Sequence, residues 1–500
     1  MGNKPDRYLF TPGSFTERLT NHRKVAYYPY DRRCSQSGGN PKHVCWALVP
    51  FVFDELLVDE SLITTKDPIY DAFKVELNKL AQTTNASVFH GLGGIAKDTQ
   101  IWKLNDARGH QKNADVAEAV WKLRSLLPGR TNAERRKLGR VAPNHILISP
   151  GNMHECPFGP PEEHFNAVPL PRQAGAGPEV VMIDSGYIRL GPIQRFLTGR
   201  VVFAEWLERS TSPAGALQYV WRPGVESPVG RSARLDQNGD GLLDALAGHA
   251  NFVAGVAAQG CESVKLTVVS HGAAFLDLDT VTNPAFVTEA AVARSLWKHH
   301  GAPVINVGFA FPTLPNAAVT SVQDTTASNE GPPSWTLQKV LDAIFDEEEE
   351  HLIVAPAGNH GCCVPQYPAA FSLQYDNVIG VGSVSAAGTR SDFSDHGPWV
   401  SCCTEGENVV STFITGWDSK PTEEPEEDGP LAGQRPPKYF ESGFAGWSGT
   451  CFAAPKVSAA LACDIAAGAT PQQAWANLIA GRPQPAALEM GYLLDGLAPY

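Results

Sequence analysis

A glycine and a threonine directly precede a potential nucleophile in the segment Trp447-Ser448-Gly449-Thr450-Cys451-Phe452-Ala453-Ala454-Pro455. Small apolar residues continue beyond this segment and favour a helix. Because proline is tolerated only in the first turn of a helix, Pro455 predicts that the helix begins close to Cys451. A thiol there faces unpaired N–H groups, which favour the thiolate and can stabilise an oxyanion. Taken alone, the segment is also typical of a buried cysteine beside an alanine-rich core helix.

Three further segments supply the partners that a nucleophile needs. They are Val180-Val181-Met182-Ile183-Asp184-Ser185-Gly186, Gly248-His249-Ala250-Asn251-Phe252-Val253-Ala254-Gly255 and Val354-Ala355-Pro356-Ala357-Gly358-Asn359-His360-Gly361. In this order the segments resemble the Asp, His and oxyanion-asparagine segments of the subtilisin-like peptidases. The segment around Cys451 resembles the Gly-Thr-Ser-x-Ala-x-Pro nucleophile segment of the same family. The chain is thereby identified as a subtilase with cysteine at the usual serine position.

The resemblance implies a role for each of four side chains. Cys451 is the nucleophile, His249 is the general base and then the acid, and Asp184 orients the imidazole. Asn359 donates a hydrogen bond to the oxyanion together with the backbone N–H of Cys451. Without the resemblance, His249 alone is equally typical of a helix N-terminus and Asp184 of a turn after a strand.

Substrate binding is also implied by the resemblance. The segment Gly308-Phe309-Ala310 is expected to pair with an extended peptide through its backbone. Together with Ala357 and Gly358 it should wall the primary specificity pocket, and small residues there favour a medium or large apolar substrate side chain. The Tyr367-Pro368 bond resembles a position that is often cis in the family.

The cysteine at position 451 leaves more than one function open. Either the protein is a natural thiol variant, or the cysteine replaces a serine, which the serine-like surroundings favour. A thiol in a site shaped for a hydroxyl is expected to cleave peptides poorly and to acylate. The main hypothesis is an endopeptidase. The alternatives are a peptide-binding protein of the same fold that does not cleave, and a thiol acyltransferase or peptide ligase.

The fold class follows from apolar runs that look buried on both faces. They occupy residues 180–183, 201–204, 264–269, 304–307, 352–355 and 378–381. Runs of this kind, separated by helical patterns, predict a mostly parallel sheet covered by helices on both faces. Such sheets carry their chemistry at the carboxyl ends of the strands, where Asp184 and Asn359 fall. The expectation is a subtilisin-like three-layer α/β fold over residues 173–500.

Residues 1–172 match no motif and are expected to form an α/β accessory region. A strand is predicted at 49–53 and helices at 71–80 and 116–123. The region is either a prosegment of the kind many relatives carry or a permanently attached domain, which the absence of a signal peptide favours. It ends in a proline-rich linker, and His154, Cys156 and His164 in that linker lack the spacing of known metal sites.

The composition of the chain limits the classes of binding partner that we expect. The net charge of −13 argues against a nucleic-acid partner, and 43% hydrophobic residues suit a globular core. No apolar h-region of a signal peptide follows the N-terminus, and no run approaches the roughly 18 apolar residues of a membrane span, so we expect a cytoplasmic protein. Free thiols are accordingly the default for the 10 cysteines. The expected partner is a peptide or protein substrate, and the chemistry needs no cofactor.

Two acidic segments remain. The first fits nine places of an EF-hand-type calcium loop, with ligand positions at Asp236, Asn238, Asp240, Leu242 and Asp244. Ala247 stands at the twelfth place instead of glutamate, so calcium binding should be weak, and a solvated turn is the alternative. The second, residues 417–440, is expected to be an exposed acidic insertion.

Overall fold

The computed structural model describes residues 25–33, 44–89, 98–105, 114–127, 136–146, 158–165, 177–185, 201–211, 217–223, 242–243, 247–270, 287–314, 331–346, 351–415, 418–419 and 440–497. Of the five expected calcium ligands, only Leu242 lies within these ranges, and most of the acidic insertion lies outside them. Leu242 belongs to the short strand β10 (Leu242–Leu243), which pairs with β17 (Asp418–Ser419).

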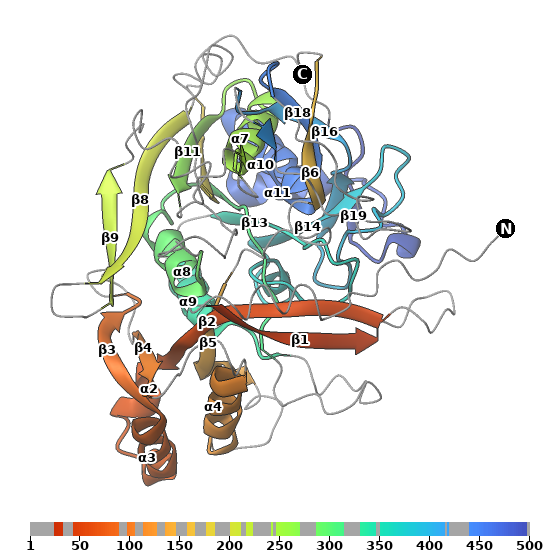
Figure 1. Ribbon diagram of the computed structural model, residues 1–500. Coiled ribbons are helices and arrows are strands. Elements are labelled where there is room, and N and C mark those ends of the chain that lie inside the picture. The colour runs from red at the N-terminus through yellow and green to blue at the C-terminus, as the bar shows by residue number, and fades with distance from the viewer. Residues whose placement is uncertain are drawn as a thin grey trace, which may run out of the picture.

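The central layer is a nine-stranded sheet (Figure 1). Its spatial order is β19 (Tyr492–Leu493), β15 (Cys402–Glu405), β14 (Val378–Val384), β13 (Leu352–Pro356), β12 (Val304–Val307), β7 (Glu179–Asp184), β11 (Lys265–Ser270), β8 (Val201–Thr211) and β9 (Leu217–Pro223). All neighbours are parallel except β8 and β9, which form an antiparallel pair. The six strands expected from the sequence are all present.

Alternating side chains of β7 show why these strands are apolar throughout. Val180 and Met182 pack on one face of the sheet against α7 (His249–Gly260) and α10 (Thr450–Ala466). Val181 and Ile183 pack on the other face against α8 (Glu289–Lys298) and α9 (Trp335–Asp346). The sheet is therefore covered on both sides, which is the three-layer α/β fold predicted. Further helical segments are α11 (Pro471–Ile479), η6 (Ala369–Leu373) and η7 (Ala486–Leu488).

The N-terminal region forms a second, antiparallel sheet. Its strands are β1 (Val25–Arg33), β2 (Val44–Asp59), β4 (Thr99–Leu104) and β3 (Ala81–Ser87) in that order, with β5 (Val141–His145) also paired to β2. Its helices are α2 (Glu60–Thr64), η1 (Pro68–Tyr70), α3 (Asp71–Leu80), α4 (Ala114–Ser125) and η3 (Arg136–Arg140). In Figure 1 this sheet lies beside α8 and α9. Val52, Leu57 and Ile101 share a core with those two helices, so the region packs directly on the central fold.

A small third sheet departs from the sequence expectation. It consists of β16 (Val409–Thr412), β18 (Phe444–Ser448) and β6 (Phe158–Glu163). Residues 158–163 were expected to be linker because Pro160 and Pro161 lie there, yet they pair with β18. A proline can occupy a strand at the edge of a sheet, since no neighbour needs its missing N–H. β6 is such an edge strand.

Some details of the chain complete the fold. The Tyr367-Pro368 bond is cis, as the resemblance implied. Six of the described cysteines form no disulfide bond, whereas Cys363 is disulfide-bonded, so the expectation of free thiols was wrong for Cys363. Among the described residues no single helix meets the length and hydropathy of a membrane span, and only the pair α10 and α11, bent by 117°, does so together.

Candidate active site

Asp184 and His249 meet at the carboxyl edge of the central sheet. Asp184 is the last residue of β7, and His249 is the first residue of α7. The Nδ1–H of His249 donates to Oδ1 of Asp184 over 2.8 Å, and each residue is only 1% exposed. The same oxygen accepts the backbone N–H of Ser185 at 2.6 Å. The carboxylate thus fixes the Nδ1 edge of the imidazole, and Nε2 lies on the opposite edge of the ring.

The approach to Asp184 depends on a glycine. A Cβ added to Gly308 would lie 2.2 Å from Oδ2 of Asp184, far inside van der Waals contact. The N–H of Gly308 also donates to the carbonyl of Ile183 over 2.9 Å, next to the aspartate. That N–H is therefore already used within the protein and is not available for the expected pairing with an extended peptide. The sequence pointed to Gly308 only as a substrate contact.

Aromatic rings hold the imidazole from the side of α10. The His249 ring lies 5.4 Å from that of Phe452 and 6.0 Å from that of Trp447, edge-on in the second case. Phe252 packs against both aromatic rings, and all three aromatics are at most 4% exposed. The imidazole is therefore packed against aromatic rings and hydrogen-bonded to the Asp184 carboxylate. No motif in the sequence indicated a role for Trp447 or Phe452.

The first turn of α10 contacts the segment that carries Asn359. The N–H of Thr450 and its hydroxyl each donate to Oδ1 of Asn359 over 2.9 Å. The hydroxyl oxygen of Thr450 in turn accepts the N–H of Gly358 at 3.2 Å. Cys451 follows Thr450, is 1% exposed and is the second residue of α10, which therefore begins close to Cys451 as predicted. Its preceding neighbour contacts Asn359, and its following neighbour contacts the ring of His249.

The expected specificity residues follow two adjacent strands. Gly308, Phe309 and Ala310 come after β12, and Ala357 and Gly358 come after its neighbour β13. Phe309 is 3% exposed and packs within the core, while Ala310 is half-buried. These two segments therefore end at the same edge of the sheet as Asp184.

A buried amide ties α10 to the sheet. Asn306, on β12, donates through Nδ2 to the hydroxyl of Ser458 over 3.0 Å, and both residues are at most 1% exposed. The hydroxyl of Ser458 donates in turn to the carbonyl of Ala454, one helical turn back. This contact fixes the helix that carries Cys451 relative to the strand before Gly308. Asn306 stands out in the sequence only as a polar residue in an apolar run.

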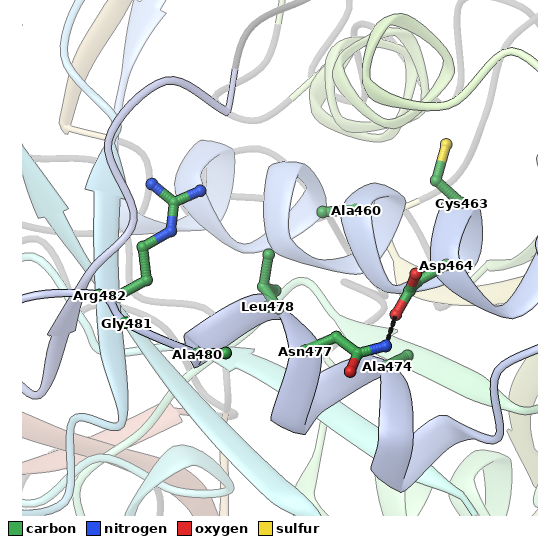
Figure 2. A pocket seen from close by; sticks show the side chains of 9 residues that line it. All are labelled: Ala460, Cys463, Asp464, Ala474, Asn477, Leu478, Ala480, Gly481 and Arg482. Carbon is green, nitrogen blue, oxygen red and sulfur yellow. Dashed lines mark hydrogen bonds between the residues drawn. The ribbon is translucent and has the colours of Figure 1, made fainter.

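Two other buried cysteines and one cavity lie outside the candidate site. Burial raises the pKa of the Cys402 thiol well above its ordinary value and that of Cys403 to about 12, so both stay protonated. A cavity of about 640 Å³ lies between α10 and α11, as Figure 2 shows. It is lined by the far half of α10, including Cys463, and by no expected site residue. Within the described ranges no cluster of three or more His, Cys, Asp or Glu side chains could hold a metal ion.

Comparison with known proteins identifies the family. Residues 216–479 match the model of the subtilase family, Peptidase_S8. The chain belongs to this family, which supports a serine-peptidase type of function acting on peptide or protein substrates. No curated protein sequence matches the chain.

Several solved structures are similar to the chain at low identity. A lanthipeptide protease is 16% identical, with 62% of this chain and 82% of that one covered and a TM-score of 0.39. A cold-adapted subtilisin-like serine proteinase is 18% identical, with 67% and 96% covered and a TM-score of 0.37. Fervidolysin from Fervidobacterium pennivorans, a keratinolytic enzyme related to subtilisin, is 17% identical, with 95% and 64% covered and a TM-score of 0.48.

Proposed function

We propose that the protein is an endopeptidase whose nucleophile is Cys451, activated by His249 and Asp184 and assisted by Asn359. The observation that carries the proposal is the 2.8 Å hydrogen bond between two buried side chains, His249 and Asp184, at the sheet edge. A buried aspartate that accepts Nδ1–H selects the tautomer whose Nε2 can take a proton. Subtilase membership supplies the reaction class.

The reaction begins with proton transfer from the Cys451 thiol to Nε2 of His249. The sulfur then forms a bond to the carbonyl carbon of the scissile peptide, whose oxygen becomes an oxyanion. Collapse of this intermediate breaks the C–N bond, and the imidazolium gives its proton to the departing amine. The thioester that remains is attacked by water, which loses a proton to His249. Collapse of this second intermediate breaks the C–S bond and releases the acid, and the imidazolium returns its proton to the sulfur to restore the thiol.

The oxyanion is the group that Asn359 and the first turn of α10 would stabilise. Because Oδ1 of Asn359 accepts two hydrogen bonds from Thr450, the amide Nδ2 faces away from Thr450. The backbone N–H of Cys451 lies at the positive end of the helix dipole. Loss of one such donor, the asparagine, lowers turnover by roughly 10²–10³-fold, a magnitude taken from subtilisin.

The substrate is proposed to be a peptide in extended conformation. Its backbone would pair with the residues that follow Gly308, and its primary side chain would enter between the ends of β12 and β13. The small residues Ala357 and Gly358 leave room there, which favours a medium or large apolar side chain. A library of peptides that differ at the residue before the scissile bond tests this preference.

Residues 1–172 are proposed to stay attached as an accessory domain. The support is a set of buried polar contacts with the rest of the chain, such as His145 Nδ1 with Glu289 at 2.5 Å. Incubation of the purified protein followed by intact mass measurement tests retention. Loss of the region during maturation would contradict this part of the proposal.

The central experiment compares cleavage by the protein with that by Cys451→Ala and His249→Ala. Both substitutions are expected to abolish cleavage of a fluorogenic peptide. Cys463→Ala, on the same helix but remote from the first turn, is the matched control and should retain activity. Iodoacetamide labelling mapped by mass spectrometry is expected to modify Cys451 more slowly in His249→Ala. Full cleavage by Cys451→Ala would remove the proposal.

A further inference from the structure

The backbone on both sides of Asn359 is held by one buried carboxylate, that of Asp395. Its Oδ1 accepts the N–H groups of His360 at 3.0 Å and Cys362 at 2.7 Å. Its Oδ2 accepts Nδ1–H of His360 at 2.9 Å. The backbone N–H of Asp395 donates to the carbonyl of Gly358 over 2.9 Å. Hydrogen bonds therefore reach the residues directly before and directly after the asparagine.

Gly358 makes this close approach possible. Its φ is 104°, in the region that favours glycine, and a Cβ there would lie 2.2 Å from Oδ2 of Asp395. The carboxylate is 0% exposed, so its three accepted hydrogen bonds form where water does not compete. Hydrogen bonds to an ionised acceptor are roughly twice as strong as neutral ones. The loop from Gly358 to Cys362 is thereby fixed to Asp395.

Asp395 is itself anchored to the central sheet. Ser394, the residue before it, accepts through its hydroxyl oxygen the N–H of Ser383 on β14, over 2.9 Å. The N–H of His396, the residue after it, donates to the carbonyl of Cys362 over 2.8 Å. The carboxylate thus connects a rigid strand to the loop that carries Asn359. No step of the proposed reaction uses the Asp395 carboxylate.

We infer that Asp395 is a positioning residue for the oxyanion hole, holding the Asn359 amide in place for the transition state. The inference rests on the proposed function, in which Asn359 is an oxyanion donor. A misplacement of about 1 Å at a catalytic group can lower the rate roughly 10²-fold. Because the oxyanion exists only after attack, the effect belongs in kcat and not in substrate binding.

Steady-state kinetics on a peptide substrate test the inference. Asp395→Ala is expected to lower kcat by roughly 10²-fold with KM unchanged. Asp395→Asn retains one acceptor oxygen and should lower kcat less. Asp392→Ala, in the same segment but exposed, is the matched control and should match the unsubstituted protein. An unchanged kcat in Asp395→Ala, or a loss carried by KM alone, overturns the inference.

A double substitution separates positioning from a general loss of structure. If Asp395 acts through Asn359, then Asn359→Ala combined with Asp395→Ala should be no slower than Asn359→Ala alone. If the double variant shows the product of the two single kcat losses, the inference is overturned. If Asn359→Ala alone leaves kcat unchanged, the oxyanion role in the proposed function fails, and the inference fails with it. Should Asp395→Ala not fold, Asp395→Asn decides: a lower kcat at unchanged KM supports the inference, and unchanged kinetics overturn it.

Discussion

Gly308 leaves the space that the Asp184 carboxylate occupies, so the position of that carboxylate depends on the absence of a side chain at residue 308. A methyl group there would displace the Asp184 carboxylate, which lies 2.2 Å from the position a Cβ would take. We predict that Gly308→Ala lowers kcat/KM by roughly 10²-fold, the effect of about 1 Å of misplacement. Gly301→Ala is the matched control, because a Cβ there meets nothing within 4 Å. Equal kinetics for the two variants would show that Asp184 tolerates the displacement.

The sequence around Cys451 resembles the serine form of the family. Sulfur is larger than oxygen, and the buried first turn of α10 leaves little room for adjustment. We predict that Cys451→Ser raises kcat for peptide hydrolysis by about 10-fold or more, below the ~10²-fold effect of a full ångström. The measurement is single-turnover cleavage, with active-site titration to count competent molecules. A fall in rate would identify the protein as a natural thiol enzyme.

At the scale of elements, the strands buried on both faces of the central sheet could be predicted from the sequence. The edge strand β6 and the helix α8 could not. The apolar runs of β7, β12 and β13 identify themselves by hydropathy alone. The strand β6 does not, because its prolines are typical of a linker and only the pairing with β18 makes it a strand. The helix α8 was also missed, although Thr288 caps it through a hydrogen bond to Ala291. Capping patterns are common, so one does not establish a helix.

The same limit applies to the candidate site. Motif order pointed to Asp184, His249, Asn359 and Cys451, and the structure brings their elements to one edge of the sheet. The contacts that fix these residues were not predictable. Asp395 reaches the Asn359 loop from a segment 33–37 positions away, and no local pattern encodes that encounter. The sequence thus indicates which groups carry chemistry, whereas their positioning depends on long-range packing.

The C-terminal end of α8 gives the fold a pH dependence. Burial lowers the pKa of His299 to about 4 from 6.5, with Lys298 adding to the effect. A lowered folded-state pKa means that the unfolded chain binds the proton more tightly, so stability rises with pH across this window. We predict that the free energy of unfolding falls as the pH decreases from about 6.5 to about 4. In His299→Gln the urea midpoint should vary less over that window, and an unchanged dependence would exclude His299 as its source.

At the scale of the whole molecule, a buried ion pair connects the N-terminal sheet to a helix that covers the central sheet. Asp59, at the end of β2, pairs with Lys339 of α9 over 2.8 Å. Burial raises the Asp59 pKa, but Lys339 and hydrogen bonds from Ser61 and Trp335 outweigh burial and leave it below its ordinary value. The pair therefore stabilises the fold at neutral pH, and this contribution is lost as the pH falls through the lowered pKa. No sequence pattern indicated that Asp59 and Lys339 would meet.

Arg124 provides the sharpest test that the two sheets form one cooperative unit. Its guanidinium is 4% exposed and donates to the carbonyls of Val141 at 2.9 Å and Leu138 at 3.1 Å in the N-terminal region. It also donates to the carbonyl of Leu314, beyond β12, over 3.2 Å. Burial lowers its pKa to about 9, and Glu289 opposes this shift, so the charge persists at neutral pH. Removing it leaves three acceptors without their charged donor.

We predict that Arg124→Met lowers the free energy of unfolding by about 3 kcal/mol, the upper range for a hydrogen bond to a charged group. Because the donor spans both regions, amide exchange should accelerate together in β2 and in β13, and denaturant unfolding should remain a single transition. Lys122→Met is the matched control, since Lys122 lies on the same helix, its side chain is 57% exposed, and it forms a surface ion pair with Glu76. Faster exchange confined to β2 would mean that the N-terminal sheet unfolds by itself, and that the interface with α8 and α9 is not needed for the stability of the central fold.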